Sequence, residues 1–294
     1  MNKVGFIGVG IMGKSMVRNL MKAGFELHIY ARTKSKVEDV ISEGAQFHES
    51  IKDCVQDCDA VITIVGFPQD VEEVYFDEGN ILDSAKEGAY LIDMTTTSPQ
   101  IAEKIYEEGT KRGFHVMDAP VTGGDTGAKA GTLSILVGGE KEDYEACMPL
   151  FEAMGTNINY QGKAGCGQHC KLANQIMIAG TLSGVCEALT YAKEQGLDPE
   201  VFMKSVATGA AGSKQLDTFG PKILKDDYAP GFFMKHFIKD MKLALIEANR
   251  KGLSLDVLSM VLANYEELEQ EGYGDLGTQA LMKFYDEEHR NMEE

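Results

Sequence analysis

Hydrophobic and polar residues follow two different rhythms along the chain. In the first part, short apolar runs rich in β-branched residues alternate with stretches of helical periodicity. This alternation is typical of strand-helix-strand units in a parallel sheet. The predicted strands are residues 3–8, 26–31, 60–65, 89–93, 114–118, 133–137 and 157–160. The predicted helices are residues 10–23, 98–111 and 141–154, and one that starts at about residue 34.

After Gly162 no strand-like run of comparable strength follows, and the pattern becomes helical throughout. The predicted helices are residues 167–195, 199–207, 236–251 and 256–270. Gly196, Gly252 and Gly272 follow three of these segments, as glycines do at helix ends. We therefore predict an α/β fold, with a doubly wound parallel sheet in residues 1–162 and an all-helical domain in residues 163–294 that begins with a long helix.

A glycine-rich turn joins the first predicted strand to the first helix. It reads Gly8-Val9-Gly10-Ile11-Met12-Gly13, which is the G-x-G-x-x-G arrangement in its strand-turn-helix context. Gly8 permits the tight turn, Gly10 lets the backbone approach a pyrophosphate, and Gly13 lets the helix pack closely on the strand. The helix start adds N–H groups and the positive end of a dipole. The turn predicts a dinucleotide cofactor, although such a turn can also exist without a ligand.

The end of the second predicted strand bears on the choice between NAD and NADP. NAD-binding proteins usually place a carboxylate there for the ribose hydroxyls. Here the strand ends in Arg32, Thr33, Lys34 and, two residues later, Lys36, with no acid among them. Arginine can bind a 2′-phosphate through two parallel hydrogen bonds. We predict NADP, with NAD as a possible alternative; an exposed basic turn without a ligand is the other interpretation.

Composition and charge restrict the partners. The formal net charge of −18 opposes binding to nucleic acid, whose affinity for proteins rests on Lys and Arg. An anionic substrate must then be held by a local positive site. The apolar runs are shorter than the ~20 residues of a bilayer span, and the strand pattern begins within three residues of Met1, so we expect a cytoplasmic protein that crosses no membrane.

The cysteines are expected to be ordinary thiols. Six cysteines in 294 residues do not form a disulfide framework. Cys166, His169 and Cys170 lie close together in the sequence, but a closed zinc site normally has four ligands. We therefore predict no metal.

Two further segments have the composition of a site rather than of a scaffold. Residues 118–124 (DAPVTGG) directly follow a predicted strand, and residues 165–174 (GCGQHCKLAN) open the long helix. Ligands of doubly wound sheets bind beyond the carboxyl ends of the strands. Lys171 lies about one turn into an otherwise apolar helix, with Asn174 three residues later on the same face. A half-buried lysine beside a cofactor has a lowered pKa and can exchange a proton with a carbonyl oxygen, whereas a surface lysine would have no such role.

These segments resemble the β-hydroxyacid dehydrogenase family, which includes 3-hydroxyisobutyrate dehydrogenase, tartronate semialdehyde reductase and the glyoxylate/succinic semialdehyde reductases. The resemblance covers essentially the whole chain. It rests on residues 8–20, 93–96 (DMTT), 118–124, 165–174 and 239–244 (KDMKLA).

The resemblance implies a Rossmann domain followed by a helical domain that supports homodimers or homotetramers. It implies hydride transfer between NADP(H) and a small hydroxy acid or semialdehyde that carries a carboxylate. Lys171 would be the catalytic acid and base. Thr122, Gly123 and Gly124 would take the substrate carboxylate, Asn174 would assist, and Thr96 and Lys239 would line the nicotinamide side of the cofactor. Phe232 and Asp240 would close the substrate pocket, although a core phenylalanine and a solvated acid are the ordinary interpretations of those two residues.

Three departures from the family pattern limit these expectations. Thr122 replaces a common Ser, Gln175 replaces the second Asn found after the lysine in 3-hydroxyisobutyrate dehydrogenases, and residues 66–68 (GFP) replace a common Leu-Pro context. The alternatives are an NADPH-dependent imine reductase and a non-catalytic dinucleotide-binding protein. Lys171 disagrees with both, because the related proteins of these kinds usually lack the lysine. Phosphogluconate-type chemistry would need a longer helical region and a cluster of basic residues.

Overall fold

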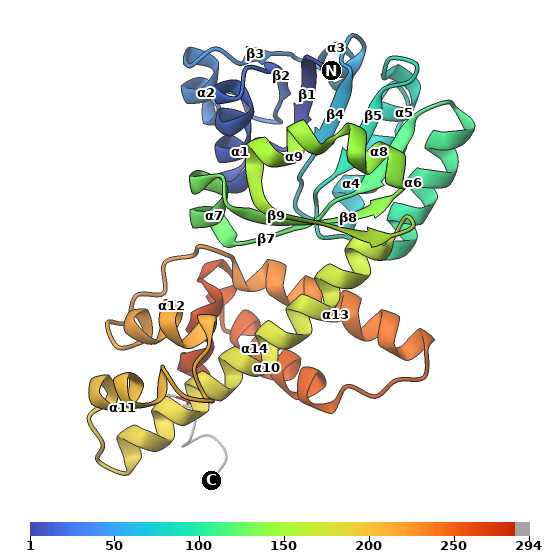
Figure 1. Ribbon diagram of the computed structural model, residues 1–294. Helices are drawn as coiled ribbons and strands as arrows, with labels where there is room; N and C mark the ends of the chain where they lie inside the picture. The colour runs from blue at the N-terminus through green and yellow to red at the C-terminus, as the bar shows by residue number, and fades with distance from the viewer. Residues whose placement is uncertain (286–294) are drawn as a thin grey trace. The chain divides into compact units, whose positions relative to one another are not determined.

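The computed structural model describes residues 1–285. The chain forms two compact units, the first from Met1 to Lys171 and the second from Leu172 onward (Figure 1). Helix α10 (Cys166–Glu194) begins in the first unit and continues into the second. The division between units therefore lies nine residues after the domain boundary predicted at residue 162, because the first turn of α10 belongs to the sheet unit.

The first unit is built on a nine-stranded sheet with the order β3-β2-β1-β4-β5-β6-β8-β7, and β9 pairs with β8. From β3 to β6 all neighbours are parallel, as predicted; β8 runs antiparallel to β6 and β7. The strands are β1 (Lys3–Ile7), β2 (Glu26–Tyr30), β3 (Gln46–Phe47), β4 (Ala60–Thr63), β5 (Tyr90–Asp93), β6 (His115–Asp118), β7 (Val121–Thr122), β8 (Leu133–Gly139) and β9 (Gly155–Gly162).

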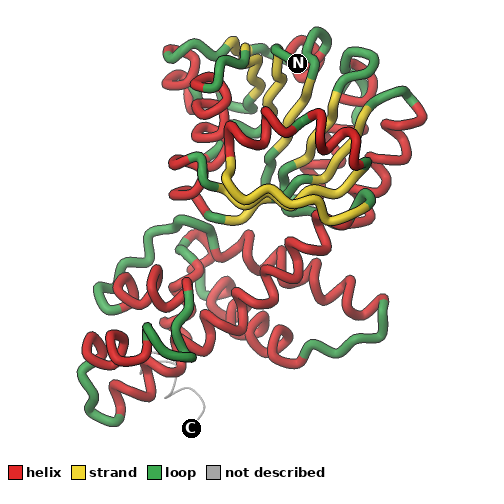
Figure 2. Tube along the Cα trace, in the orientation of Figure 1, coloured by secondary structure: helices red, strands yellow, loops and turns green. Residues whose placement is uncertain are grey.

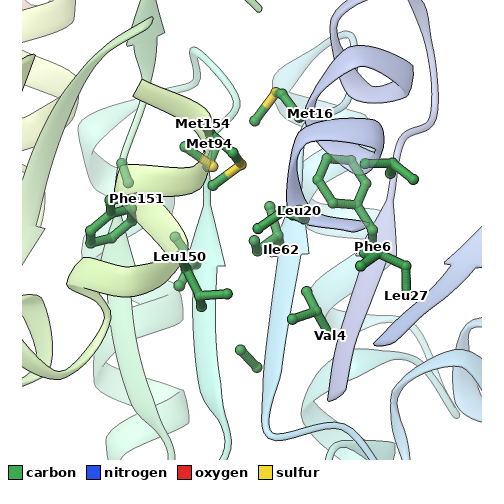
Figure 3. Packing of buried hydrophobic residues seen from close by; sticks show 14 of the residues in the cluster. Val4, Phe6, Met16, Leu20, Leu27, Ile62, Met94, Leu150, Phe151 and Met154 are labelled. Atoms are coloured by element: carbon green, nitrogen blue, oxygen red, sulfur yellow. The ribbon is translucent and has the colours of Figure 1, made fainter. Parts of the chain in front are cut away.

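Helices cover both faces of this sheet, which makes it doubly wound. Val4 and Phe6 of β1 belong to an apolar cluster on one face that also contains Leu20 of α1 and Phe151 of α9 (Figure 3). Ile7, which points to the opposite face as strand alternation requires, belongs to a second apolar cluster. The helices of this unit are α1 (Ile11–Lys22), α2 (Glu38–Ser42), α3 (Ile51–Val55), α4 (Pro68–Phe76), α5 (Ile81–Ser84), α6 (Pro99–Lys111), α7 (Gly124–Ala130), α8 (Lys141–Ala146) and α9 (Met148–Met154).

Two predicted helices of this unit differ from the structure. The helix expected from residue 34 starts as a single 3-10 turn, Lys34–Lys36, before α2. The helix expected over residues 141–154 is divided at Cys147 into α8 and α9. Pro149, in the first turn of α9, has no N–H and its ring would collide with a continuous preceding turn. The short helices α3, α4, α5 and α7 were not predicted.

The described part of the second unit consists of helices and loops (Figure 2). Its core is an apolar cluster around α10 in which Leu182, Phe237 and Tyr265 are fully buried. The unpredicted α12 contributes Leu216 and Ile223. The elements after α10 are α11 (Pro199–Val206), α12 (Lys214–Ile223), α13 (Met234–Arg250), α14 (Asp256–Gln270) and the 3-10 helices Tyr273–Asp275 and Thr278–Tyr285.

Helix α10 is long and apolar enough to cross a membrane, and it is the one helix within residues 1–285 with such a length and composition. Its composition has another explanation, because Leu172, Leu182 and Leu189 lie in the core of the second unit. Buried core helices can have the same length and apolar composition. The expectation that no segment crosses a membrane stays a prediction.

Candidate active site and cofactor site

The turn between β1 and α1 has the shape that a dinucleotide needs. A side chain at Gly8, whose φ is +97°, would overlap the carbonyl group of Ile64, and one at Gly13 would overlap the carbonyl oxygen of Gly8. A Cβ at Gly10 would meet nothing within 4 Å. Internal packing therefore explains Gly8 and Gly13, whereas Gly10 leaves room for a group outside the chain.

The start of α1 adds electrostatic complementarity to this room. Gly10 caps the helix without any side-chain hydrogen bond, and the first turn holds no acidic residue. Ile11 is 54% exposed and Met12 is half-buried. The first N–H groups of a helix have no partner within the helix and favour anions. These residues fit the pyrophosphate of a dinucleotide.

The register of the sheet explains why separate motifs reach one edge. Ile7 pairs with Tyr30 and with Thr63, Thr63 pairs with Asp93, and Asp93 pairs with Asp118. The segments that follow these residues all leave the sheet at the carboxyl ends of parallel strands, where ligands of such sheets bind. The segments are the glycine turn, residues 31–36, residues 64–67, residues 94–97 with Thr96, and residues 119–124.

Two buried carboxylates end neighbouring strands at this edge. Asp93 accepts hydrogen bonds from the hydroxyl of Thr63 at 2.7 Å and from the N–H of Thr95 at 3.1 Å. Burial raises the pKa of Asp93 to about 6. Asp118 accepts the N–H groups of Gly165 and Gln168, each at 2.8 Å, and burial raises its pKa too. Asp118 therefore caps the start of α10.

Gln168 ties the first turn of α10 to the segment after β5. Its amide donates to the carbonyl oxygen of Thr95 at 2.7 Å, and its oxygen accepts the N–H of Thr97 at 3.0 Å. Gln168, Thr95 and Thr97 are all buried. Both neighbours of Thr96 are thus fixed to the helix turn that precedes Lys171. Lys171 itself is buried, with 7% of the residue exposed.

The predicted substrate-binding residues of the first unit lie in a short hairpin-like segment. Thr122 is half-buried in β7 and pairs with Ser134 of β8. Gly123 and Gly124 have positive φ values, +131° and +64°. Only glycine adopts such backbone angles readily, so the segment needs these residue types. Gly124 is the first residue of α7, a helix that the sequence analysis did not predict.

In the second unit, Asn174, Gln175 and Asp240 form a chain of hydrogen bonds. The amide of Asn174 donates to Gln175 at 2.8 Å, and the amide of Gln175 donates to Asp240 at 2.7 Å. Lys239 forms an ion pair with Asp240 at 3.0 Å. Asp240 is fully buried, so it is not the solvated acid of the ordinary interpretation. Gln175, which the sequence analysis noted only as a departure, is the residue that connects Asn174 to this acid.

Phe232 occupies a separate aromatic group of the second unit. Its ring stacks on His236 with centroids 6.4 Å apart and meets the edge of Phe237 at 6.1 Å. The side chain is half-buried and packs against the apolar cluster of this unit. Phe232 is therefore partly a core residue, in agreement with its ordinary interpretation.

Two of the basic residues after β2, Arg32 and Lys34, are exposed and already paired with acids. Arg32 is bonded to Asp70 and lies 3.9 Å from Glu73, both in α4. Lys34 lies 3.3 Å from Glu49. The remaining two residues of the prediction, Thr33 and Lys36, are exposed.

The sequence analysis did not assign a role to two residues that bond to the site, Asp70 and Gln168. Asp70 is 38 residues from Arg32, and no local pattern reveals such a pairing. Gln168 did have a signal, because it lies three residues before Lys171 inside the segment singled out as a site.

Within residues 1–285, no group of three or more His, Cys, Asp and Glu residues is placed to hold a metal ion.

Comparisons with known proteins agree with this organisation. Residues 3–162 match the NAD-binding domain of 6-phosphogluconate dehydrogenase, and residues 165–285 match the NAD-binding family of NADP-dependent 3-hydroxyisobutyrate dehydrogenase. The chain is 50% identical to an uncharacterised oxidoreductase, YkwC, of Bacillus subtilis over 96% of this chain and 98% of the relative. The chain belongs to the β-hydroxyacid dehydrogenase family.

Two other matches have more specific names. A probable mitochondrial 3-hydroxyisobutyrate dehydrogenase-like protein of Arabidopsis thaliana is 44% identical over 95% of this chain and 84% of its own length. The solved structure of Mycobacterium tuberculosis 3-hydroxyisobutyrate dehydrogenase with L-serine superposes with a TM-score of 0.88, at 26% identity, over 96% of this chain and 98% of that one. The predicted family, fold class and NAD(P)-dependent oxidoreductase activity, of the kind this family has on small hydroxy acids and semialdehydes, are confirmed.

Proposed function

We propose that this β-hydroxyacid dehydrogenase reduces a small aldehyde or keto acid with NADPH and runs the reverse oxidation of the hydroxy acid, with Lys171 as the catalytic acid and base. The observation that carries the proposal is the setting of Lys171. It is 7% exposed, and the helix turn that precedes it is bonded to the ends of two parallel strands through Asp118 and Gln168.

The bound nicotinamide supplies the hydride in the reductive direction. As the carbonyl carbon is reduced, its oxygen needs a proton, and the Lys171 ammonium donates it; the neutral amine takes the proton back in the reverse reaction. Burial disfavours the charged form of a lysine, so a buried position suits a group that must both donate and accept a proton.

Substrate binding is assigned to residues that offer donors to a carboxylate. The Thr122 hydroxyl and the N–H groups of Gly123 and Gly124 take the carboxylate, because backbone N–H groups in left-handed segments favour anions. Asn174, held by Gln175, assists. We assign Phe232 and Asp240 to the substrate pocket, where Asp240 acts through its bond to Gln175.

For the cofactor, we propose NADP in preference to NAD. Arg32, with Thr33 and Lys36, receives the 2′-phosphate, while Gly8, Gly10, Ile11, Met12 and Gly13 hold the pyrophosphate. Thr96 and Lys239 line the nicotinamide side. An NADPH preference favours reduction in the cell. We further propose a cytoplasmic homodimer or homotetramer whose cofactor domain is residues 1–162 and whose substrate and oligomerisation domain is residues 163–294.

The test follows the oxidation of NADPH, and separately NADH, by absorbance, with glyoxylate, succinic semialdehyde, tartronate semialdehyde and methylmalonate semialdehyde. We expect one of these to be reduced, and Lys171→Ala to lower kcat by about 10²- to 10⁴-fold. Lys163→Ala, at an exposed lysine eight residues earlier, is the matched control and should keep full activity.

A direct titration with NADPH shows whether Lys171→Ala still binds the cofactor, as it should if the lysine acts on the substrate. Full activity of this variant would overturn the catalytic assignment. Reduction of a cyclic imine in place of every aldehyde acid would favour the imine reductase alternative. Tighter binding of NADH than NADPH would overturn the cofactor preference alone.

A further inference from the structure

The acid that the end of β2 lacks is supplied by a different element. Asp70, in the first turn of α4, is bonded to Arg32 through one carboxylate oxygen. Its other oxygen accepts the N–H of Phe67 at 2.9 Å, which holds the carboxylate at the start of the helix. The Asp70 side chain is 18% exposed and that of Arg32 is 62% exposed. The acid is therefore the fixed partner and the arginine the more accessible one.

This pairing changes what the basic residues can offer to a 2′-phosphate. A guanidinium binds phosphate best when both prongs of its fork are available. One Nη of Arg32 is taken by Asp70, with the Glu73 carboxylate 3.9 Å away, and Lys34 faces Glu49. A phosphate that reaches Arg32 must displace or share the Asp70 bond beside a negative charge. A ribose without the phosphate meets no such repulsion, and a carboxylate accepts hydrogen bonds from ribose hydroxyls.

We propose that Asp70 determines how strongly this enzyme discriminates between NADP and NAD, by holding Arg32 away from the 2′-phosphate and by serving the 2′-hydroxyl of NAD. This inference rests on the proposed cofactor site, in which the adenosine ribose lies at the end of β2. Arg32 and Asp70 then form a pair in which each member favours one cofactor. Glu73 adds a weaker effect of the same sign, because it is more distant and its side chain is 56% exposed.

The test compares Asp70→Asn with wild type by calorimetric titration of NADPH, NADH, adenosine 2′,5′-bisphosphate and 5′-AMP, which needs no substrate. Asparagine keeps an oxygen for the N–H of Phe67 and removes the charge. We expect NADPH and the bisphosphate to bind about tenfold more tightly and NADH and 5′-AMP to bind equally or more weakly, a shift of about 1.4 kcal/mol in the preference. Glu73→Gln should shift it in the same direction by less.

The matched control is Glu72→Gln, which removes an acid from the same helix that pairs with Lys104 and not with Arg32. It should leave the preference unchanged. When Arg32→Ala is already present, adding Asp70→Asn should improve NADPH binding much less, because Asp70 affects NADPH binding through Arg32. If Asp70→Asn is not obtained folded, Asp70→Ser keeps a hydroxyl acceptor for Phe67 and takes its place.

An unchanged ratio of NADPH to NADH affinity in Asp70→Asn would overturn the inference. This outcome is distinct from failure of the proposed function. If wild type prefers NADH, the NADP preference is wrong, yet the substitution must still move the ratio toward NADPH. If Gly10→Ala leaves binding of both cofactors intact, the cofactor site itself is wrong, and with it this inference.

Discussion

The two units hold their parts of α10 with different forces. In the first unit, the first turn of α10 is fixed by hydrogen bonds that its N–H groups donate to Asp118 and that the Gln168 side chain donates to Thr95; Asp118 and Gln168 are both buried. In the second unit, the rest of the helix is held mainly by apolar packing, with Leu182 and Leu189 in the cluster. Hydrogen bonds depend on direction and apolar packing does not. The lysine that needs a defined position therefore lies in the part of the helix with directional contacts.

The largest effect is expected where the backbone of the first unit is tightest. Gly8→Ala places a Cβ against the carbonyl of Ile64 at a φ of +97°, and should lower the free energy of unfolding by about 4 kcal/mol. Gly10→Ala meets open space and should keep the stability while weakening cofactor binding. Chemical denaturation and NADPH titration measure the two quantities. Equal stability losses in both variants would contradict this distinction.

The apolar core of the second unit is tested next. Leu182→Ala removes a fully buried side chain and should cost about 3 kcal/mol. Met177→Ala, on the same helix, changes a side chain that is 74% exposed and should cost little. Denaturation followed by circular dichroism compares them. If the two losses are similar, the core does not stabilise α10 as argued.

Asp93→Asn sharpens the role of buried charge in the first unit. The folded pKa of Asp93, about 6, exceeds its ordinary value of 3.8. Its proton therefore stabilises the fold fully below pH 3.8, and that stability is lost as the pH rises through about 6. Near pH 8 the buried charge costs about 2 to 3 kcal/mol. Asparagine stays neutral and can still accept from Thr63 and Thr95.

We therefore expect Asp93→Asn to raise the free energy of unfolding at about pH 8 by ~2 kcal/mol, with the gain shrinking toward about pH 4. Denaturant titrations across this range measure it. A gain that is constant with pH would show that the charge of Asp93 is not its cause.

The smallest effect concerns a polar contact within the core of the second unit. The hydroxyl of Tyr265 donates to the carbonyl oxygen of Thr278 at 2.7 Å, and the side chain is fully buried. Tyr265→Phe keeps the ring and should cost about 1 kcal/mol. Thermal unfolding is sensitive enough to detect the change. A loss as large as that of Leu182→Ala would mean that this unit depends on hydrogen bonds as much as the first.

Most of the fold could be predicted because strands and long helices carry strong periodic patterns. The helix Asp256–Gln270 was predicted with its observed ends, and seven of the nine strands of the first unit were predicted to within one or two residues at each end. The two-residue strands β3 and β7 were missed. The short helices α3 and α5 were missed, since four or five residues show no helical period. The contiguous site motifs were visible for the same local reason. The bond from Asp70 to Arg32 depends on the folded sheet and had no local signal.

The capping of α10 by Asp118 also bears on how members of this family could be recombined. A chimaera joined at residue 162 would take Asp118 from one parent and, from the other parent, the N–H groups of residues 165 and 168 that donate hydrogen bonds to it. A junction after Lys171 inherits the carboxylate, the turn and the lysine together. Grafting a foreign helical domain onto this sheet is therefore best done inside the helix, at the cost of interrupting a regular element rather than a loop.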